Sequence, residues 1–150
     1  MSLVDLITAD RLSVPMRSKN KAEAIRELVA LVAGTSGIGN AAEITEAVEA
    51  RESLCSTGLD RGIAIPHAKT EKVQSLKVAV GIAPKGIDFD ALDGKPSRLF
   101  FMILTPPDQS EEHVKALSEI AAITQSSSFV QSLIRASSPE EAVDLFHHMK

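Results

Sequence analysis

Residues 19–33 place their apolar side chains three or four positions apart, which is the spacing of an amphipathic helix. We expect Ser18 to cap this helix at its N-terminus. A second helix is predicted to begin at Asn40, which forms a capping pair with Glu43, and to end near residue 51 or 52. The expected buried positions of the two helices are Ala22, Ile25, Leu28, Val29, Val32, Ile44, Ala47 and Val48.

The middle of the chain changes to short apolar runs that are typical of strands. Residues 62–65, 76–83 and 98–104 are three such runs, and they are separated by turn-forming residues. The run 98–104 is apolar at nearly every position, which predicts a central strand covered on both faces. Ile87 and Phe89 indicate a small extra strand between the last two runs.

Three further helices are expected after the strands. The first begins at a Ser110 cap, with His113 three residues in and a buried stripe made by Val114, Leu117, Ile120, Ala121 and Thr124. A short helix follows at residues 129–134, and the last helix begins at a Ser138 cap followed by Pro139. Helices, then strands, then helices predict an α/β fold with the sheet sandwiched between helices, and residues 1–150 are expected to form a single domain.

The composition narrows the classes of function. The 150 residues carry 16 Lys and Arg against 20 Asp and Glu, a net charge of −4, which argues against nucleic acid as the partner. The absence of Trp and Tyr leaves few faces for stacking bases or sugars. Cys55 is the single cysteine, so no internal disulfide can form. With no signal peptide and no apolar run longer than six residues, we expect a cytoplasmic protein without membrane insertion.

His67 is the histidine in the most informative place. It directly follows Pro66 at the end of an apolar run, so the backbone can fix the direction of its ring. Near pH 7 a large fraction of histidine side chains is unprotonated, and the neutral imidazole is a good nucleophile. The alternative is a turn histidine that forms a hydrogen bond with a nearby carbonyl group.

Other candidate residues also have two interpretations. His113, near a helix N-terminus, is either a neutral hydrogen-bond donor to an oxyanion or a solvated first-turn residue. Arg51, in the last turn of a helix, either binds free carbonyl groups or binds phosphate oxygens. Cys55 is expected to be a small buried residue, and His147 and His148 a solvated tail. The sequence contains no metal-binding motif, no nucleotide-binding glycine pattern and no serine nucleophile motif.

Residues 51–68 carry a family resemblance that covers essentially the whole chain. Their Arg-Glu, Ser-Thr-Gly and Ile-Pro-His elements resemble the signature of type-2 enzyme IIA. These are the fructose, mannitol and nitrogen-regulatory IIA domains of the bacterial phosphoenolpyruvate-dependent phosphotransferase system. Residues 89–96, 100–104 and 112–117 are also similar to the family, and the last of these carries the second family histidine. Asp60 stands where many members have glycine, and we expect the loop to keep its shape because Asp tolerates left-handed backbone.

The resemblance implies a central mixed sheet between helices and a phosphocarrier function. His67 would accept a phosphoryl group from phosphorylated HPr or from a nitrogen-branch relative of HPr. His113, as a neutral donor, and Arg51, as a cation, would offset the added charge, with no metal and no cofactor. The group would then pass to a IIB domain or serve as a signal to regulatory target proteins. The acids Glu71, Asp88, Asp108, Glu111 and Glu112 would steer a basic partner.

Three alternatives remain open at this point. The 150 residues hold no IIB, membrane IIC or HPr segment, which favours a nitrogen-regulatory IIA over a sugar-specific IIA without excluding the latter. A binding module with the same fold but no phosphoryl chemistry would act through its docking face alone. A small hydrolase with His67 as the base is disfavoured, since no Ser or Cys nucleophile with an orienting carboxylate stands out.

Overall fold

A mixed five-stranded sheet forms the centre of the computed structural model, which describes residues 2–33 and 41–148. The strand order is β1-β4-β5-β2, and β3 also pairs with β5. β4 and β5 are antiparallel, whereas β1 is parallel to β4 and both β2 and β3 are parallel to β5. The strands are β1 (Leu12–Ser13), β2 (Ile63–Ala64), β3 (His67–Lys69), β4 (Lys77–Ile87) and β5 (Ser97–Thr105).

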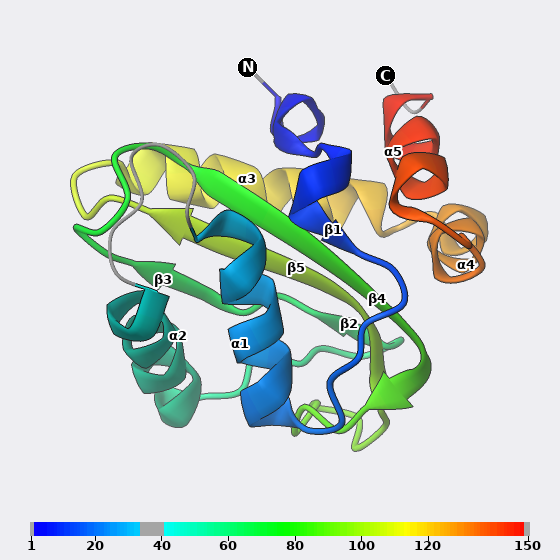
Figure 1. Ribbon diagram of the computed structural model, residues 1–150, viewed down its shortest axis with the longest axis horizontal. Coiled ribbons are helices and arrows are strands. Elements are labelled where there is room, and N and C mark those ends of the chain that lie inside the picture. Colours follow the sequence, from blue (N-terminus) through cyan, green and yellow to red (C-terminus); the bar gives the residue numbers. More distant parts are fainter. Residues whose placement is uncertain (1, 34–40, 149–150) are drawn as a thin grey trace.

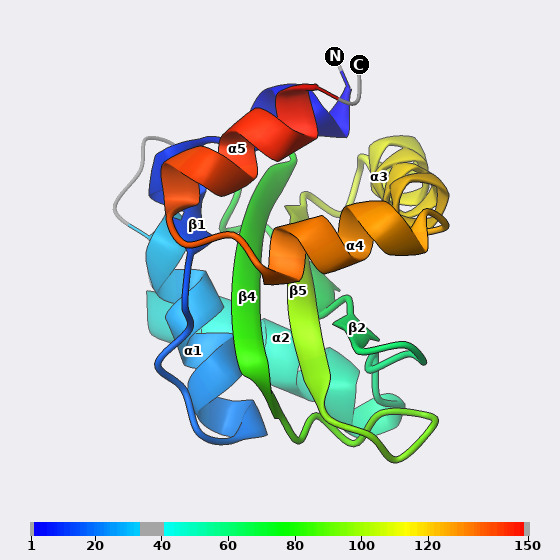
Figure 2. The same ribbon diagram turned by 90° about the vertical axis from the view of Figure 1, so that its right-hand side faces the viewer.

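Helices cover both faces of this sheet. α1 and α2 pack on one face, and α3, α4 and α5 belong to the opposite face (Figure 1 and Figure 2). The predicted α/β sandwich is therefore confirmed. The helices are α1 (Lys21–Val32), α2 (Ala41–Leu54), α3 (Ser110–Ile123), α4 (Ser127–Ile134) and α5 (Pro139–His147), preceded by the short 3-10 helices η1 (Leu3–Leu6) and η2 (Ala9–Arg11).

β5 is the strand on which both halves of the core depend. Side chains alternate across a strand, and the apolar run of β5 therefore reaches both faces. Leu99, Phe101 and Ile103 pack with α3, α4 and α5, whereas Phe100, Met102 and Leu104 pack with α1 and α2. This confirms the prediction that the run 98–104 is central and covered on both sides, with Arg98 as its exposed member.

The helix starts differ in part from the expectation. Asn20 caps α1, because its side chain accepts the N–H of Glu23, while the Ser18 hydroxyl instead donates to Glu27. The predicted Asn40 cap of α2 lies outside the described residues. Ser138 caps α5 as predicted, and its hydroxyl oxygen accepts the N–H of Glu141.

The predicted buried stripe of α3 is partly wrong. His113, Ala116 and Ile120 face inward, whereas Val114 is 61% exposed and Ala121 is also exposed. Ser110 is the first helical residue rather than the cap. This helix carries apolar side chains on several of its sides, so their periodicity alone does not show which side is buried. The helix turns His113 and Ala116 toward β5, which leaves Val114 at the surface.

Two strand predictions also need correction. β4 continues to Ile87 through a register shift after Ile82, so the turn-forming residues 84–86 that follow the predicted run 76–83 lie within one strand. Phe89 lies outside the strands, and its ring is fully buried against Phe100 with the ring centroids 5.3 Å apart. The short strand β3 was not predicted, because three residues are too few to show a period.

Replacing Phe101 tests the role of β5 as the shared centre of the core. Its ring is fully buried and meets Phe146 of α5 edge to face at 6.1 Å between centroids. We expect Phe101→Ala to lower the free energy of unfolding by about 3–5 kcal/mol, because a cavity replaces the ring. Val114→Ala is the matched control and should change it by less than about 0.5 kcal/mol in urea unfolding. Equal losses in the two variants would contradict this assignment of the core.

Candidate functional site

His67 is the first residue of β3, and its backbone is tightly fixed. It pairs with Ile103 of β5, and the Ile103 N–H donates to the carbonyl of the preceding Pro66 at 3.0 Å. The proline ring restricts the backbone just before the histidine. The direction in which the imidazole leaves the sheet is therefore set by strand pairing rather than by a free loop.

One hydrogen bond determines which ring nitrogen of His67 is available. Nδ1 of His67 lies 2.7 Å from the carbonyl oxygen of Ile65. A carbonyl oxygen can only accept, so Nδ1 carries the proton and Nε2 of the neutral ring keeps its lone pair. Both interpretations of His67 are compatible here, because the bond to a nearby carbonyl frees the other nitrogen to act as a nucleophile.

Burial is the main cause that lowers the pKa of His67 below its usual 6.5. The hydrogen bond to Ile65 acts in the opposite direction, and the positive charges of Arg51 and Lys69 add to the lowering. The neutral, nucleophilic form is therefore the prevailing one at pH 7.

His113 lies against His67 although the two residues are far apart in the sequence. It is 5% exposed, and the two ring centroids are 5.2 Å apart with the planes at 61°. Its Nδ1 is 2.7 Å from Oγ1 of Thr105, the last residue of β5. Burial first, then the charges of His67, Lys69 and Arg51, lower the pKa of His113 to about 4. The interpretation of His113 as a solvated first-turn residue is therefore wrong.

Arg51 lies in the last turn of α2. Together with His67 and His113, it lines a cleft in the surface. Its Nη1 donates to the carbonyl oxygen of Cys55 at 3.0 Å, which is the interaction expected of a cation at a helix C-terminus. That bond orients the guanidinium group and leaves further N–H groups for an anion. Cys55 itself is exposed, so the expectation of a buried cysteine is wrong.

The three predicted residues line one cleft of about 430 Å³. Its other lining residues are Ala47, Ala68, Lys69 and Leu117. Because both histidines are neutral at pH 7, the charge of the cleft comes from the cations Arg51 and Lys69. A cleft lined by two cations together with Ala47, Ala68 and Leu117 suits an anionic group such as phosphate.

Lys69 and Thr105 are site residues that the sequence analysis missed. Lys69 follows His67 by two positions on β3, so both side chains leave the strand on the same side. Its Nζ donates to Oγ of Ser110 at 3.1 Å, which ties β3 to the first turn of α3. Period-two spacing from His67 could have identified Lys69. Thr105 gave only a weak signal, as a polar residue at the end of the apolar run 98–104.

The loop before β2 explains why Asp60 is tolerated. Arg61 and Gly62 have positive φ angles of 59° and 77°, whereas Asp60 does not. The left-handed conformation therefore falls after Asp60 and places no glycine requirement on it. Glycine is needed instead at Gly58, where an added Cβ would lie 2.9 Å from the Cα of Ala91.

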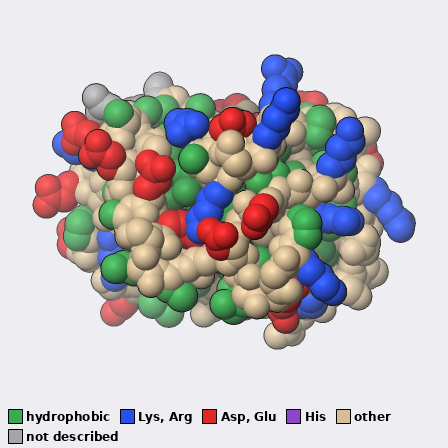
Figure 3. Space-filling model, turned by 90° about the horizontal axis from the view of Figure 1, so that it is seen from below, with side chains coloured by type: hydrophobic (Ala, Val, Ile, Leu, Met, Phe, Trp, Pro, Cys, Tyr) green, Lys and Arg blue, Asp and Glu red, His purple; other side chains and the backbone are tan. Residues whose placement is uncertain are grey.

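Charged side chains are unevenly distributed on the face of the molecule seen in Figure 3. Acidic side chains gather at its left and in its middle, while most Lys and Arg side chains lie toward its right. Within residues 2–33 and 41–148, no group of three His, Cys, Asp or Glu residues is placed to hold a metal ion. No helix within these ranges has the length and apolar character needed to cross a membrane.

Comparison with known proteins identifies the family of this chain. The family model for "Phosphoenolpyruvate-dependent sugar phosphotransferase system, EIIA 2" matches residues 5–149. A nitrogen regulatory protein of Pseudomonas aeruginosa is 36% identical over 141 residues, which is 94% of this chain and 91% of that protein. The fructose-specific EIIABC component of Bacillus subtilis is 32% identical over 147 residues, which is 98% of this chain but 23% of that longer protein.

A solved structure gives the same result for the fold. The crystal structure of the nitrogen regulatory protein IIA-Ntr from Neisseria meningitidis matches with a TM-score of 0.87 at 31% identity, covering 96% of this chain and 98% of that chain. The match of the family model to nearly the whole chain, together with these relatives, shows the family. The chain belongs to the type-2 EIIA family of the phosphoenolpyruvate-dependent sugar phosphotransferase system.

Proposed function

We propose that this protein is a phosphocarrier that accepts a phosphoryl group on Nε2 of His67 from phosphorylated HPr or a nitrogen-branch relative of HPr. The observation that supports this most strongly is the 2.7 Å hydrogen bond from Nδ1 of His67 to the Ile65 carbonyl. It holds the proton on Nδ1 and presents the Nε2 lone pair in a cleft with two cations.

The transfer exchanges one phosphorus–nitrogen bond for another. The Nε2 lone pair of His67 attacks the phosphorus atom in line, and the bond to the donor's phosphohistidine nitrogen breaks and returns its electron pair to the donor. The proton on Nδ1 of His67 stays in its hydrogen bond to Ile65, so no proton has to move. Catalysis then consists mainly of positioning the two rings and stabilising the equatorial oxygens.

Three groups that line the cleft support this proposal, because each of them can stabilise those oxygens. Arg51 offers N–H groups in a planar fork, and Lys69 offers a compact charge. When the Thr105 hydroxyl donates to Nδ1 of His113, the proton of that ring is on Nε2, where it can donate to the phosphoryl group. Because the pKa of His113 is near 4, chiefly through burial, this ring acts as a neutral donor at pH 7.

The nitrogen-regulatory and the sugar-specific members of the family differ in what happens to the phosphoryl group after His67 has accepted it. We propose that the protein acts as a nitrogen-regulatory IIA whose phosphorylation state is read by regulatory targets, as the names of the Pseudomonas and Neisseria relatives suggest. A sugar-specific IIA that passes the group to a IIB domain is the second candidate, because the Bacillus relative is a fructose-specific component. Discharge by an added IIB domain separates these two functions.

The surface around His67 fits a transient protein partner. Val114, the residue after His113, is 61% exposed, and the half-buried Leu117 lines the cleft. Glu111 and Glu112 are exposed in the same turn of α3. An apolar patch with an acidic rim favours a partner with an apolar contact surrounded by basic residues.

Intact mass tests the acceptor directly. After incubation with enzyme I, HPr, phosphoenolpyruvate and magnesium, we expect one acid-labile phosphoryl group on the wild type and none on His67→Ala. His147→Ala, which alters an exposed histidine on α5, is the control and should be phosphorylated normally. A wild type that gains no group with HPr proteins from several sources, nitrogen-branch relatives included, would favour the docking-only module.

The pH dependence follows from the lowered pKa values. Burial lowers the pKa of His67 below 6.5, so protonation of the nucleophile requires a pH below that value. At pH 6.5 we therefore expect more than about half of the molecules to keep a neutral His67. NMR titration of the imidazole protons checks this, and Lys69→Ala should move the His67 midpoint upward because a nearby positive charge is lost. A wild-type midpoint at or above 6.5 would refute the expected environment.

Charge reversal tests the acidic rim. We expect the double variant Glu111→Lys and Glu112→Lys to slow phosphorylation by HPr roughly tenfold at low salt, with a smaller effect at high salt. Glu140→Lys on α5 is a matched control on an exposed residue of another helix. Equal rates in the wild type and the double variant would count against electrostatic steering by this turn.

A further inference from the structure

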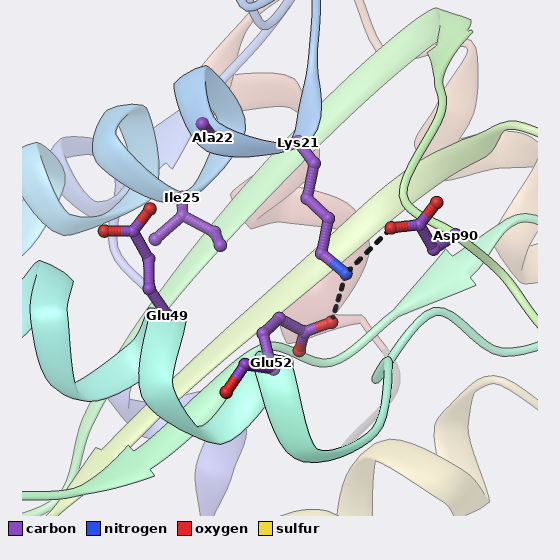
Figure 4. A pocket seen from close by; sticks show the side chains of 7 residues that line it. Lys21, Ala22, Ile25, Glu49, Glu52 and Asp90 are labelled. Atoms are coloured by element: carbon purple, nitrogen blue, oxygen red, sulfur yellow. Dashed lines mark hydrogen bonds and ion pairs between the residues drawn. The ribbon is translucent and has the colours of Figure 1, made fainter.

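Glu52 is a buried carboxylate that the proposed chemistry does not use. It is 6% exposed at the end of α2, next to Arg51, and its ion pair with Lys21 has an Nζ–Oε1 distance of 2.9 Å. Figure 4 shows Lys21 reaching from α1 to a position between Glu52 and Asp90, whose Oδ2 is 3.4 Å from the same Nζ. Burying a charged group is costly, so a buried carboxylate that is held by an ion pair points to a structural or functional role.

The other partner of Glu52 is Thr57. The Thr57 N–H donates to Oε1 of Glu52 at 2.9 Å, and the Thr57 hydroxyl donates to Oε2. Thr57 is itself 6% exposed. The carboxylate therefore fixes both the backbone and the side chain of this residue, and charge-assisted bonds of this kind are stronger than neutral ones.

Thr57 is in turn hydrogen-bonded to Ile65, which lies two residues before His67. The Ile65 N–H donates to the carbonyl oxygen of Thr57 at 3.0 Å, and the Ile65 carbonyl accepts from Nδ1 of His67 at 2.7 Å. Ile65 is thus hydrogen-bonded on both sides, with Pro66 restricting the backbone after it. The chain of contacts runs without a break from Glu52 through Thr57 and Ile65 to the imidazole.

We propose that Glu52 is a positioning residue that, through Thr57 and Ile65, holds the proton of His67 on Nδ1 and keeps Nε2 free to react. Lys21 stabilises the carboxylate in place, and its Nζ also lies 4.9 Å from the centre of the buried Phe89 ring. The effect on phosphoryl transfer rests on the proposed function, but the effect on the His67 proton does not.

The experiment compares Glu52→Ala with Glu52→Gln in protein labelled with nitrogen-15 at histidine. Long-range proton–nitrogen NMR spectra report which nitrogen of His67 carries the proton, and intact mass against time reports the rate of phosphorylation. In Glu52→Ala we expect a smaller share of the Nδ1–H form and a rate about ten to a hundred times lower, as for a misplaced reacting group. The amide oxygen of Gln can still accept the Thr57 N–H. We therefore expect Glu52→Gln to retain most of the Nδ1–H form and most of the rate of phosphorylation.

Glu27→Ala is the matched control. Glu27 is also a carboxylate that clamps a loop, because it accepts the N–H groups of Arg17 and Ser18, but it belongs to α1 and does not contact the His67 chain. If Glu52→Ala leaves the position of the His67 proton unchanged and slows transfer no more than Glu27→Ala does, the proposal is wrong.

Where Glu52→Ala does not fold, Glu52→Asp takes its place, since its shorter side chain cannot keep both contacts to Thr57. If the wild type accepts no phosphoryl group, the proposed function fails and the tautomer comparison alone decides the role of Glu52.

Discussion

The hydrogen bond between Nδ1 of His67 and the Ile65 carbonyl decides what this cleft can do. Without it, either nitrogen could carry the proton and the ring could rotate. With it, the ring has one reactive atom and one orientation, and both are set by backbone that two strands hold in place. The lowered pKa of the ring and the nearby cations matter because this bond already leaves the lone pair of Nε2 free in a residue that lines the cleft.

The sheet brings the two histidines together. β3 runs parallel to β5, so His67 lies beside Ile103 near the carboxyl end of the central strand, and Thr105 ends that strand. α3 begins a few residues later and returns across the sheet with His113 in its first turn. Ligand-binding residues commonly gather outside the carboxyl ends of strands, because loops and helix starts converge there. The site is therefore a consequence of strand order as much as of individual side chains.

Much of the fold could be predicted from the sequence, since residues 98–104 and 19–33 have strong and unambiguous patterns. The errors fall where local pattern carries little information. β3 is too short to show a period, and α3 has apolar residues on several sides, so Val114 and Ala116 could not be distinguished. The positions of His67, His113 and Arg51 in the sequence made them candidates, and the family resemblance chose between their possible roles, while Lys69 and Thr105 were missed. The contact between His67 and His113 depends on tertiary packing, which spacing along the chain does not encode.

The neutrality of the two histidines has a consequence for how a partner would distinguish the two states of the protein. The charges that line the unmodified cleft are those of Arg51 and Lys69, and a phosphoryl group on His67 would add net negative charge beside them. Modification would thus make the cleft less positive, while the exposed Val114 and the acidic turn of α3 stay as they are. A partner could sense this change in local charge through contacts that stay fixed in shape, so a rigid scaffold is sufficient to transmit the signal.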